Sequence, residues 1–161
     1  MRRTVSTAVV GIVAALGLAV FALSCGDSTA AGPPLFTANL VGSGEPTPTG
    51  STATGTATFS DNTSSIDYVL TVSPMTAISA SHIHVGPPGC VCPVIINLFI
   101  PNGNTGTVSG VIATGTITAA NNSKVSLDSL RVLFNNGNAY VNVHTFAFSG
   151  GEIRGVVTRT N

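Results

Sequence analysis

Charged side chains are scarce in this sequence of 161 residues. Only 7% of the residues are Asp, Glu, Lys or Arg, whereas a typical soluble domain contains about 25%. The chain is nevertheless 43% hydrophobic, which excludes intrinsic disorder, because disordered chains combine low hydrophobicity with high charge. Tryptophan is absent, and no basic cluster occurs beyond Arg2-Arg3. The sequence therefore lacks the electrostatic footprint of a nucleic-acid-binding protein.

Motifs for hydrolytic and phosphate chemistry are also missing. The six acidic residues are scattered along the chain, and neither a Gly-x-Ser-x-Gly motif nor a phosphate-binding loop occurs. These absences argue against paired carboxylates, a serine nucleophile and nucleotide chemistry. We therefore predict that the chain is not an enzyme, and a copper redox enzyme is the one enzymatic alternative that its histidines leave open.

The N-terminal residues have the pattern of an export signal. Met1-Arg2-Arg3 is followed by an apolar run from Ala8 to Leu23, which is shorter than the ~20 residues that a membrane-spanning helix needs. The stretch Ala22-Leu23-Ser24-Cys25-Gly26 resembles a bacterial lipobox, in which Cys25 becomes the lipid-carrying N-terminus. We predict a lipoprotein signal peptide at 1–24, a lipidated and flexible tether at 25–34, and an extracytoplasmic protein anchored to a membrane of the cell envelope.

Residues 35–160 are predicted to form one all-β domain. Thr52–Phe59 shows the pattern most clearly, because threonines alternate with Ala53, Gly55, Ala57 and Phe59, and a period of two marks a half-buried strand. Seven further strands are expected at Leu35–Val41, Ile66–Ser73, Ile78–Val85, Val94–Ile100, Gly106–Thr118, Ala139–His144 and Glu152–Thr158. Val94–Ile100 is apolar on both faces, which is typical of a central strand.

The one helical segment is Ser126–Asn135. Ser126 is a suitable N-cap, and Leu127, Leu130 and Phe134 share one face. Short strands with turn-rich connections favour an antiparallel Greek-key β-sandwich, immunoglobulin-like or superoxide dismutase-like, with this one short helix.

Two unusual stretches of the sequence resemble the CHRD (chordin-type) domain. They are Ser81-His82-Ile83-His84-Val85-Gly86, and Tyr140-Val141-Asn142-Val143-His144-Thr145 with the following Gly151-Glu152-Ile153-Arg154-Gly155. The resemblance covers nearly all of residues 35–158 and implies an extracytoplasmic β-sandwich. In animals the domain occurs in chordin, an extracellular antagonist of growth factors, and in bacteria it occurs in secreted and lipid-anchored proteins. Cys90-Val91-Cys92 departs from the family, which usually has a glycine-rich turn without thiols there.

The three histidines of the chain all lie in these two stretches. His82 and His84 leave the same face of one strand, with Cα atoms about 6.5–7 Å apart. If the strand of His144 is a neighbour, three imidazoles converge and leave an open position, which suits copper or zinc. The His-x-His spacing is similar to the copper strand of copper–zinc superoxide dismutase. The alternative is that the histidines only form hydrogen bonds that support the fold.

Three residues of the second stretch are candidates for supporting roles around this site. Asn142 lies on the same strand face as His144. Glu152 and Arg154 share a face of the following strand, where we expect them to pair near His144. In that position Glu152 would orient a histidine ring as an acceptor outside the metal ligands. An exposed ion pair of little consequence is the alternative.

Cys90 and Cys92 allow three interpretations. In an oxidising compartment they form a small disulfide, although an extended Cys-x-Cys puts the two Cα atoms ~6.8 Å apart and the chain must bend to bridge them. The other interpretations are two free thiols, or soft ligands beside His82 and His84 that would favour copper(I).

Three functions therefore remain open. The first is a lipid-anchored CHRD binding module with a copper or zinc site at His82, His84 and His144. The second is a structural or interaction domain that binds an envelope protein or a glycan. The third is a copper enzyme similar to superoxide dismutase. None of the three involves nucleic acid.

Overall fold

The structure, a computed structural model, describes residues 35–161. The predicted signal peptide at 1–24 and the predicted lipidated tether at 25–34, including Cys25, lie outside the described residues. Within residues 35–161, no helix has the length and apolar character needed to cross a membrane.

The described residues form nine strands, one α-helix and a short 3-10 turn at Gly42–Gly44. The strands are β1 (Leu35–Val41), β2 (Thr54–Asn62), β3 (Ser65–Thr76), β4 (Ile78–Val85), β5 (Val94–Phe99), β6 (Thr107–Ile117), β7 (Ala139–Thr145), β8 (Ile153–Val156) and β9 (Thr158–Arg159). The helix is α1 (Leu127–Asn135). The antiparallel all-β fold with one short helix is thereby confirmed.

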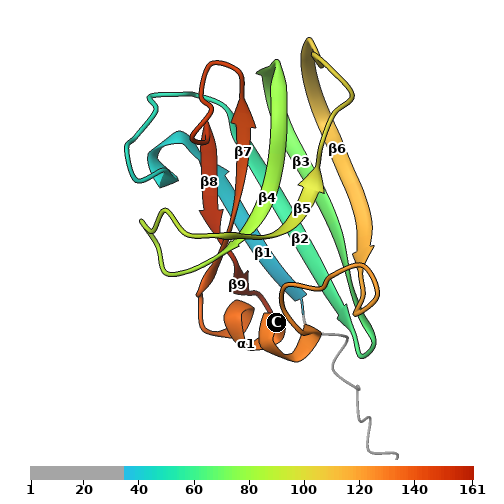
Figure 1. Cartoon of the computed structure of the whole chain (residues 1–161). Helices are drawn as coiled ribbons and strands as arrows, with labels where there is room; N and C mark the ends of the chain where they lie inside the picture. The colour runs from blue at the N-terminus through green and yellow to red at the C-terminus, as the bar shows by residue number, and fades with distance from the viewer. Residues whose placement is uncertain (1–34) are drawn as a thin grey trace, which may run out of the picture. The chain divides into compact units, whose positions relative to one another are not determined.

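Hydrogen bonds join the strands into one sheet in the order β5-β4-β7-β8-β1-β2-β3-β6, and β9 pairs with β1. The sheet curls over on itself, so that β4, β7 and β8 lie in front of β1, β2 and β3 (Figure 1). The hydrophobic core fills the space between these two halves and includes Phe36, Phe59, Leu70, Ile83 and Val141, each 0% exposed.

The expectation that Val94–Ile100 is a central strand is wrong, because β5 stands at one end of the sheet. Its free edge is covered by other groups. The Tyr68 hydroxyl donates to the Leu98 carbonyl at 3.2 Å, and the Lys124 ammonium donates to the Val94 carbonyl at 3.0 Å. A covered edge strand can be apolar on both faces without offering an open pairing edge.

The helix α1 closes one end of the core. Ser126 caps it, because the Ser126 hydroxyl accepts a hydrogen bond from the Ser129 N–H at 3.1 Å. Leu130 and Phe134 are 0% exposed, and the Phe134 ring packs 4.9 Å from the ring of Phe59 between centroids. The predicted cap and buried face are both confirmed.

The histidines of β4 and β7 lie on the outer face of the sheet. Ile83, Val141 and Val143 point into the core, so their neighbours His82 and His84 on β4, with Asn142 on β7, point the other way. The segment between β4 and β5 crosses this outer face in front of β7 and β8 (Figure 1). The crossing segment, residues 86–93, buries polar side chains that an ordinary outer face would expose to water.

Candidate metal centre

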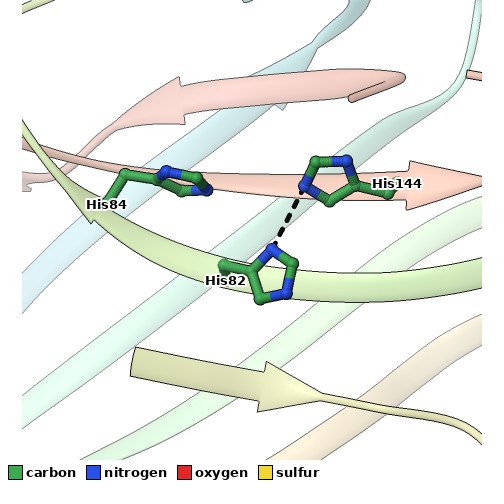
Figure 2. Close-up of side chains that lie close together, drawn as sticks. All are labelled: His82, His84 and His144. Atoms are coloured by element: carbon green, nitrogen blue, oxygen red, sulfur yellow. Dashed lines mark hydrogen bonds between the residues drawn. The ribbon is translucent and has the colours of Figure 1, made fainter. Parts of the chain in front are cut away.

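The three histidines form one cluster. β4 and β7 are antiparallel neighbours in which His82 stands opposite Asn142 and Ala80 stands opposite His144. His82 and His144 are therefore diagonal neighbours on one face, within reach of long side chains. One ring nitrogen from each histidine lies within 4.8 Å of the other two, and the rings present these nitrogens to a common space (Figure 2). The convergence that we expected from neighbouring strands is present.

His144 is held by a backbone carbonyl. Its Nδ1 lies 2.9 Å from the Ser149 oxygen, and a carbonyl only accepts, so Nδ1 carries the proton and Nε2 of the neutral ring carries a lone pair. That Nε2 lies 3.1 Å from Nδ1 of His82 (Figure 2). In the metal-free cluster His82 therefore donates to His144.

His84 is also held by a backbone carbonyl, that of Cys92 in the crossing segment. Its Nδ1 donates to the Cys92 carbonyl at 2.6 Å, and its ring stacks on Tyr140 at 4.7 Å between centroids with 8° between planes. Its Nε2 therefore carries a lone pair, and the nearest partner is Asn142 Oδ1 at 3.0 Å. An oxygen facing a lone pair is unfavourable unless the amide turns over or a cation takes the lone pair.

A buried ion pair lies beside the histidines. Arg154 stands opposite Asn142 on β8, its guanidinium pairs with Glu45 at 2.7 Å, and its Cζ lies 4.0 Å above the Tyr140 ring centroid. Arg154 also donates to the Cys90 carbonyl at 2.7 Å. The pair thus links the strands β7 and β8, the 42–53 loop and the crossing segment.

The family model of the CHRD domain matches residues 36–157 of the chain. The chain belongs to the CHRD domain family. No curated protein and no solved structure matches the chain. The CHRD match indicates a binding module of the extracytoplasmic type and covers every residue of the histidine cluster.

In this CHRD domain Cys90 and Cys92 are joined by a disulfide. Their Cα atoms are 5.3 Å apart, because the chain turns after Gly86-Pro87-Pro88 and the Cys90 N–H donates to the Pro87 carbonyl. The disulfide interpretation therefore describes this structure. Bonded sulfurs are not thiolates, so the soft-ligand role does not apply to this oxidised form.

Glu152 differs from its predicted role. Its carboxylate accepts from the Ser51 hydroxyl and the Thr145 hydroxyl, each at 2.7 Å, and contacts no histidine ring among the hydrogen bonds of residues 35–161. The expected pairing of Glu152 with Arg154 is wrong, because Arg154 pairs with Glu45. Asn142, in contrast, does contact a candidate ligand, His84.

Sequence reasoning did not single out Glu45 as part of this site. The residue lies in a Gly/Pro/Thr-rich loop, and loop residues are usually exposed, yet it is only 5% exposed. One feature of the sequence does point to it, namely the scarcity of charged residues. An acidic residue that is buried in a folded loop of such a chain needs a cationic partner.

Burial keeps the three histidines of the CHRD domain neutral. Partial burial lowers the pKa of His82 to about 4, with smaller contributions from His144, His84 and Lys124. Burial also lowers the pKa of His84 and of His144, although the hydrogen bonds to Cys92 and Ser149 oppose the shift. Neutral imidazoles are the form that binds metal ions, so the cluster is in its ligand form at pH 7.

We expect the metal-free protein to lose thermal stability as the pH falls from about 6.5 to about 4. Histidines of the unfolded chain bind protons near 6.5, whereas His82 in the folded chain binds one only near 4. The unfolded state therefore binds more protons in this window, and acid favours unfolding. Thermal unfolding followed by circular dichroism at several pH values measures the effect. The His82→Asn variant should show a shallower pH dependence, and an equally steep one would contradict the prediction.

Proposed function

We propose that this protein is a lipid-anchored, extracytoplasmic CHRD-domain module that binds one copper or zinc ion through His82, His84 and His144. One observation carries the proposal. His84 and His144 each give their Nδ1–H to a backbone carbonyl, which leaves a lone pair on each Nε2, and one ring nitrogen of each histidine lies within 4.8 Å of those of the other two. Metal-binding histidines characteristically donate their other ring nitrogen to such an acceptor.

The donor set fits these two metals. Three neutral imidazole nitrogens are the protein donor set of copper sites and of zinc sites whose fourth position takes water or substrate. The bound ion would supply a Lewis-acidic or, for copper, a redox-active centre. The residues of this chain hold the rings: Cys92 and Ser149 fix the tautomers, and Tyr140 supports the plane of His84.

The proposal predicts that the full-length chain retains one equivalent of metal. The purified protein is exposed to copper(I), copper(II) and zinc in separate samples, unbound metal is removed, and bound metal is measured by elemental analysis. The wild type should retain about one ion per chain, and the His82→Ala/His84→Ala double variant should retain none. Val111→Ala, at a side chain that is 61% exposed on β6, is the matched control and should bind as the wild type does.

The outcome also decides between the proposal and a structural role. The second candidate function, an interaction domain for an envelope protein or glycan, is favoured by the contact of His84 Nε2 with Asn142, because both ring nitrogens then have protein partners. If the wild type retains none of the three ions, the histidines serve the fold, and chemical crosslinking in the cell envelope becomes the search for the partner. A redox enzyme would further require turnover that depends on bound copper.

A further inference from the structure

The disulfide segment touches the histidine cluster through its backbone. The Cys92 carbonyl is the acceptor that fixes the tautomer of His84. The Cys92 N–H donates to the Tyr140 hydroxyl at 3.1 Å, and the Tyr140 ring is the one that stacks on His84. One support of His84 is therefore Cys92 itself, and the other, Tyr140, is hydrogen-bonded to Cys92.

The disulfide holds Cys92 in place together with two hydrogen bonds, from the Cys92 N–H to Tyr140 and from the Val85 N–H to the Pro93 carbonyl. A Cβ at Gly86 would come within 2.5 Å of the Cys92 sulfur and 3.1 Å of the Cys90 sulfur, so the two cysteines fold tightly against the end of β4. The Cys90 carbonyl is anchored by Arg154. Because the disulfide joins the two residues, the hydrogen bond that holds Cys90 also restricts the position of the Cys92 carbonyl.

The crosslink lies at the surface rather than in the core. Val91, between the two cysteines, is 87% exposed, and Cys90 and Cys92 are themselves partly exposed. A reductant in solution therefore has access to the bond. Accessible disulfides are the ones that thiol exchange opens.

We infer that the Cys90–Cys92 disulfide is a redox switch that sets the metal affinity of the histidine cluster. This inference rests on the proposed metal site. In the oxidised form the Cys92 carbonyl holds His84 with its Nε2 lone pair directed to the metal position. Opening the bond frees Cys92 from Cys90, so the Cys92 carbonyl is held less firmly and fixes the tautomer and orientation of His84 less well.

The reaction that operates the switch is thiol–disulfide exchange with a dithiol. One thiolate of the reductant attacks a sulfur of the disulfide and forms a mixed disulfide, releasing the other cysteine as a thiol. The second thiol of the reductant then displaces the remaining cysteine. The chain gains two electrons and two protons, and the dithiol leaves as a disulfide. The reverse exchange with an oxidised dithiol resets the site.

The test is zinc binding to the full-length chain in both redox forms. Loss of a partner outside the metal ligands typically weakens metal binding by about 10–100-fold, so we expect the zinc Kd to rise by that factor after reduction with a phosphine. Zinc is chosen because it has no redox chemistry of its own. Reoxidation should restore the original Kd, which shows that the change is reversible, and an unchanged circular dichroism spectrum of the reduced chain shows that it is not unfolding.

Two variants separate the crosslink from the thiols. Cys90→Ser/Cys92→Ser removes both the bond and the sulfur ligands, and should bind zinc as weakly as the reduced wild type. Val91→Ala keeps the disulfide and should bind as the oxidised wild type does. If reduction leaves the Kd unchanged, or tightens binding because the thiols become ligands, the inference is overturned.

A metal-free readout reports on the same contact. Nitrogen NMR of the histidine rings should show His84 as the Nδ1–H tautomer in the oxidised chain and as a mixture of tautomers after reduction. An unchanged His84 tautomer would also overturn the switch. If the oxidised wild type retains none of copper(I), copper(II) and zinc, the proposed metal site is wrong and the inferred switch is wrong with it. If the zinc affinity is equal in both redox forms, the inferred switch is wrong but the proposed metal site stands.

Discussion

Replacing Arg154 with methionine should lower the free energy of unfolding by ~3–5 kcal/mol at pH 7, because the change leaves the buried Glu45 carboxylate without its counter-charge. The two side chains are each only 4% exposed and 2.7 Å apart. Methionine fills much of the volume of the arginine side chain, so the lost stability comes mainly from the missing charge and less from lost packing. Urea unfolding followed by circular dichroism measures it, since the chain has no tryptophan to report by fluorescence.

The pH dependence of this loss identifies its cause. Burial raises the pKa of Glu45 above its ordinary value of 4.5, and Arg154 opposes that rise. Without Arg154 the pKa in the folded state rises further. The protonated form is then tolerated, so the deficit relative to wild type should be small below pH 4.5 and should grow as the pH rises through the folded-state pKa.

The double variant Glu45→Gln/Arg154→Met is the control for the ion pair. It removes both charges together, and replacing a buried pair with neutral groups is often close to neutral. We expect it to recover most of the stability lost in Arg154→Met at pH 7. A double variant as unstable as the single one would mean that the contacts of Arg154 with Tyr140 and Cys90, and not its charge, stabilise the fold.

Truncating Phe134 to alanine is the second change with a large expected effect, a loss of ~3–5 kcal/mol. Phe134 is 0% exposed, and its ring lies 5.4 Å from the Phe36 ring and 4.9 Å from the Phe59 ring, between centroids. These contacts attach α1 to the strands β1 and β2. The cavity left by the ring lies between α1 and the paired strands β1 and β2, whose hydrogen bonds limit how far the site can collapse around it.

Val132→Ala on the same helix is the matched control, because Val132 is 57% exposed. Surface changes of this kind usually alter stability by less than about 0.5 kcal/mol. Phe134→Leu should fall between the two, since it keeps most of the buried area. Equal losses in Phe134→Ala and Val132→Ala would show that the aromatic contacts of Phe134 do not hold α1 in place.

The histidine cluster and the Glu45–Arg154 ion pair are connected through the disulfide segment. Arg154 reaches Cys90, Cys90 is bonded to Cys92, and the Cys92 carbonyl fixes His84. Arg154→Met should therefore also disturb metal binding, whereas Phe134→Ala removes contacts at α1. Comparing zinc affinity in these two variants distinguishes a local effect on the site from general destabilisation.

The amino-acid sequence by itself determined most of the strands, the helix and the three histidines of the candidate site. Strand alternation and helix capping are local properties, which is why β1, β4 and the Ser126 cap lie where the sequence predicts. The shared face of His82 and His84 follows from the two-residue period of a single strand. The family resemblance rested on the same local motifs, and the match over 36–157 confirmed it.

Only the tertiary structure decided which segments meet. The diagonal contact of His144 with His82 depends on the register of β4 with β7, and the pairing of Arg154 with Glu45 depends on a loop that folds back over β8. The expected partner, Glu152, was nearer in the sequence but is bonded to Ser51 and Thr145 instead. Such contacts join segments far apart in the chain, and they are selected by the packing of the whole sheet, which no local pattern encodes.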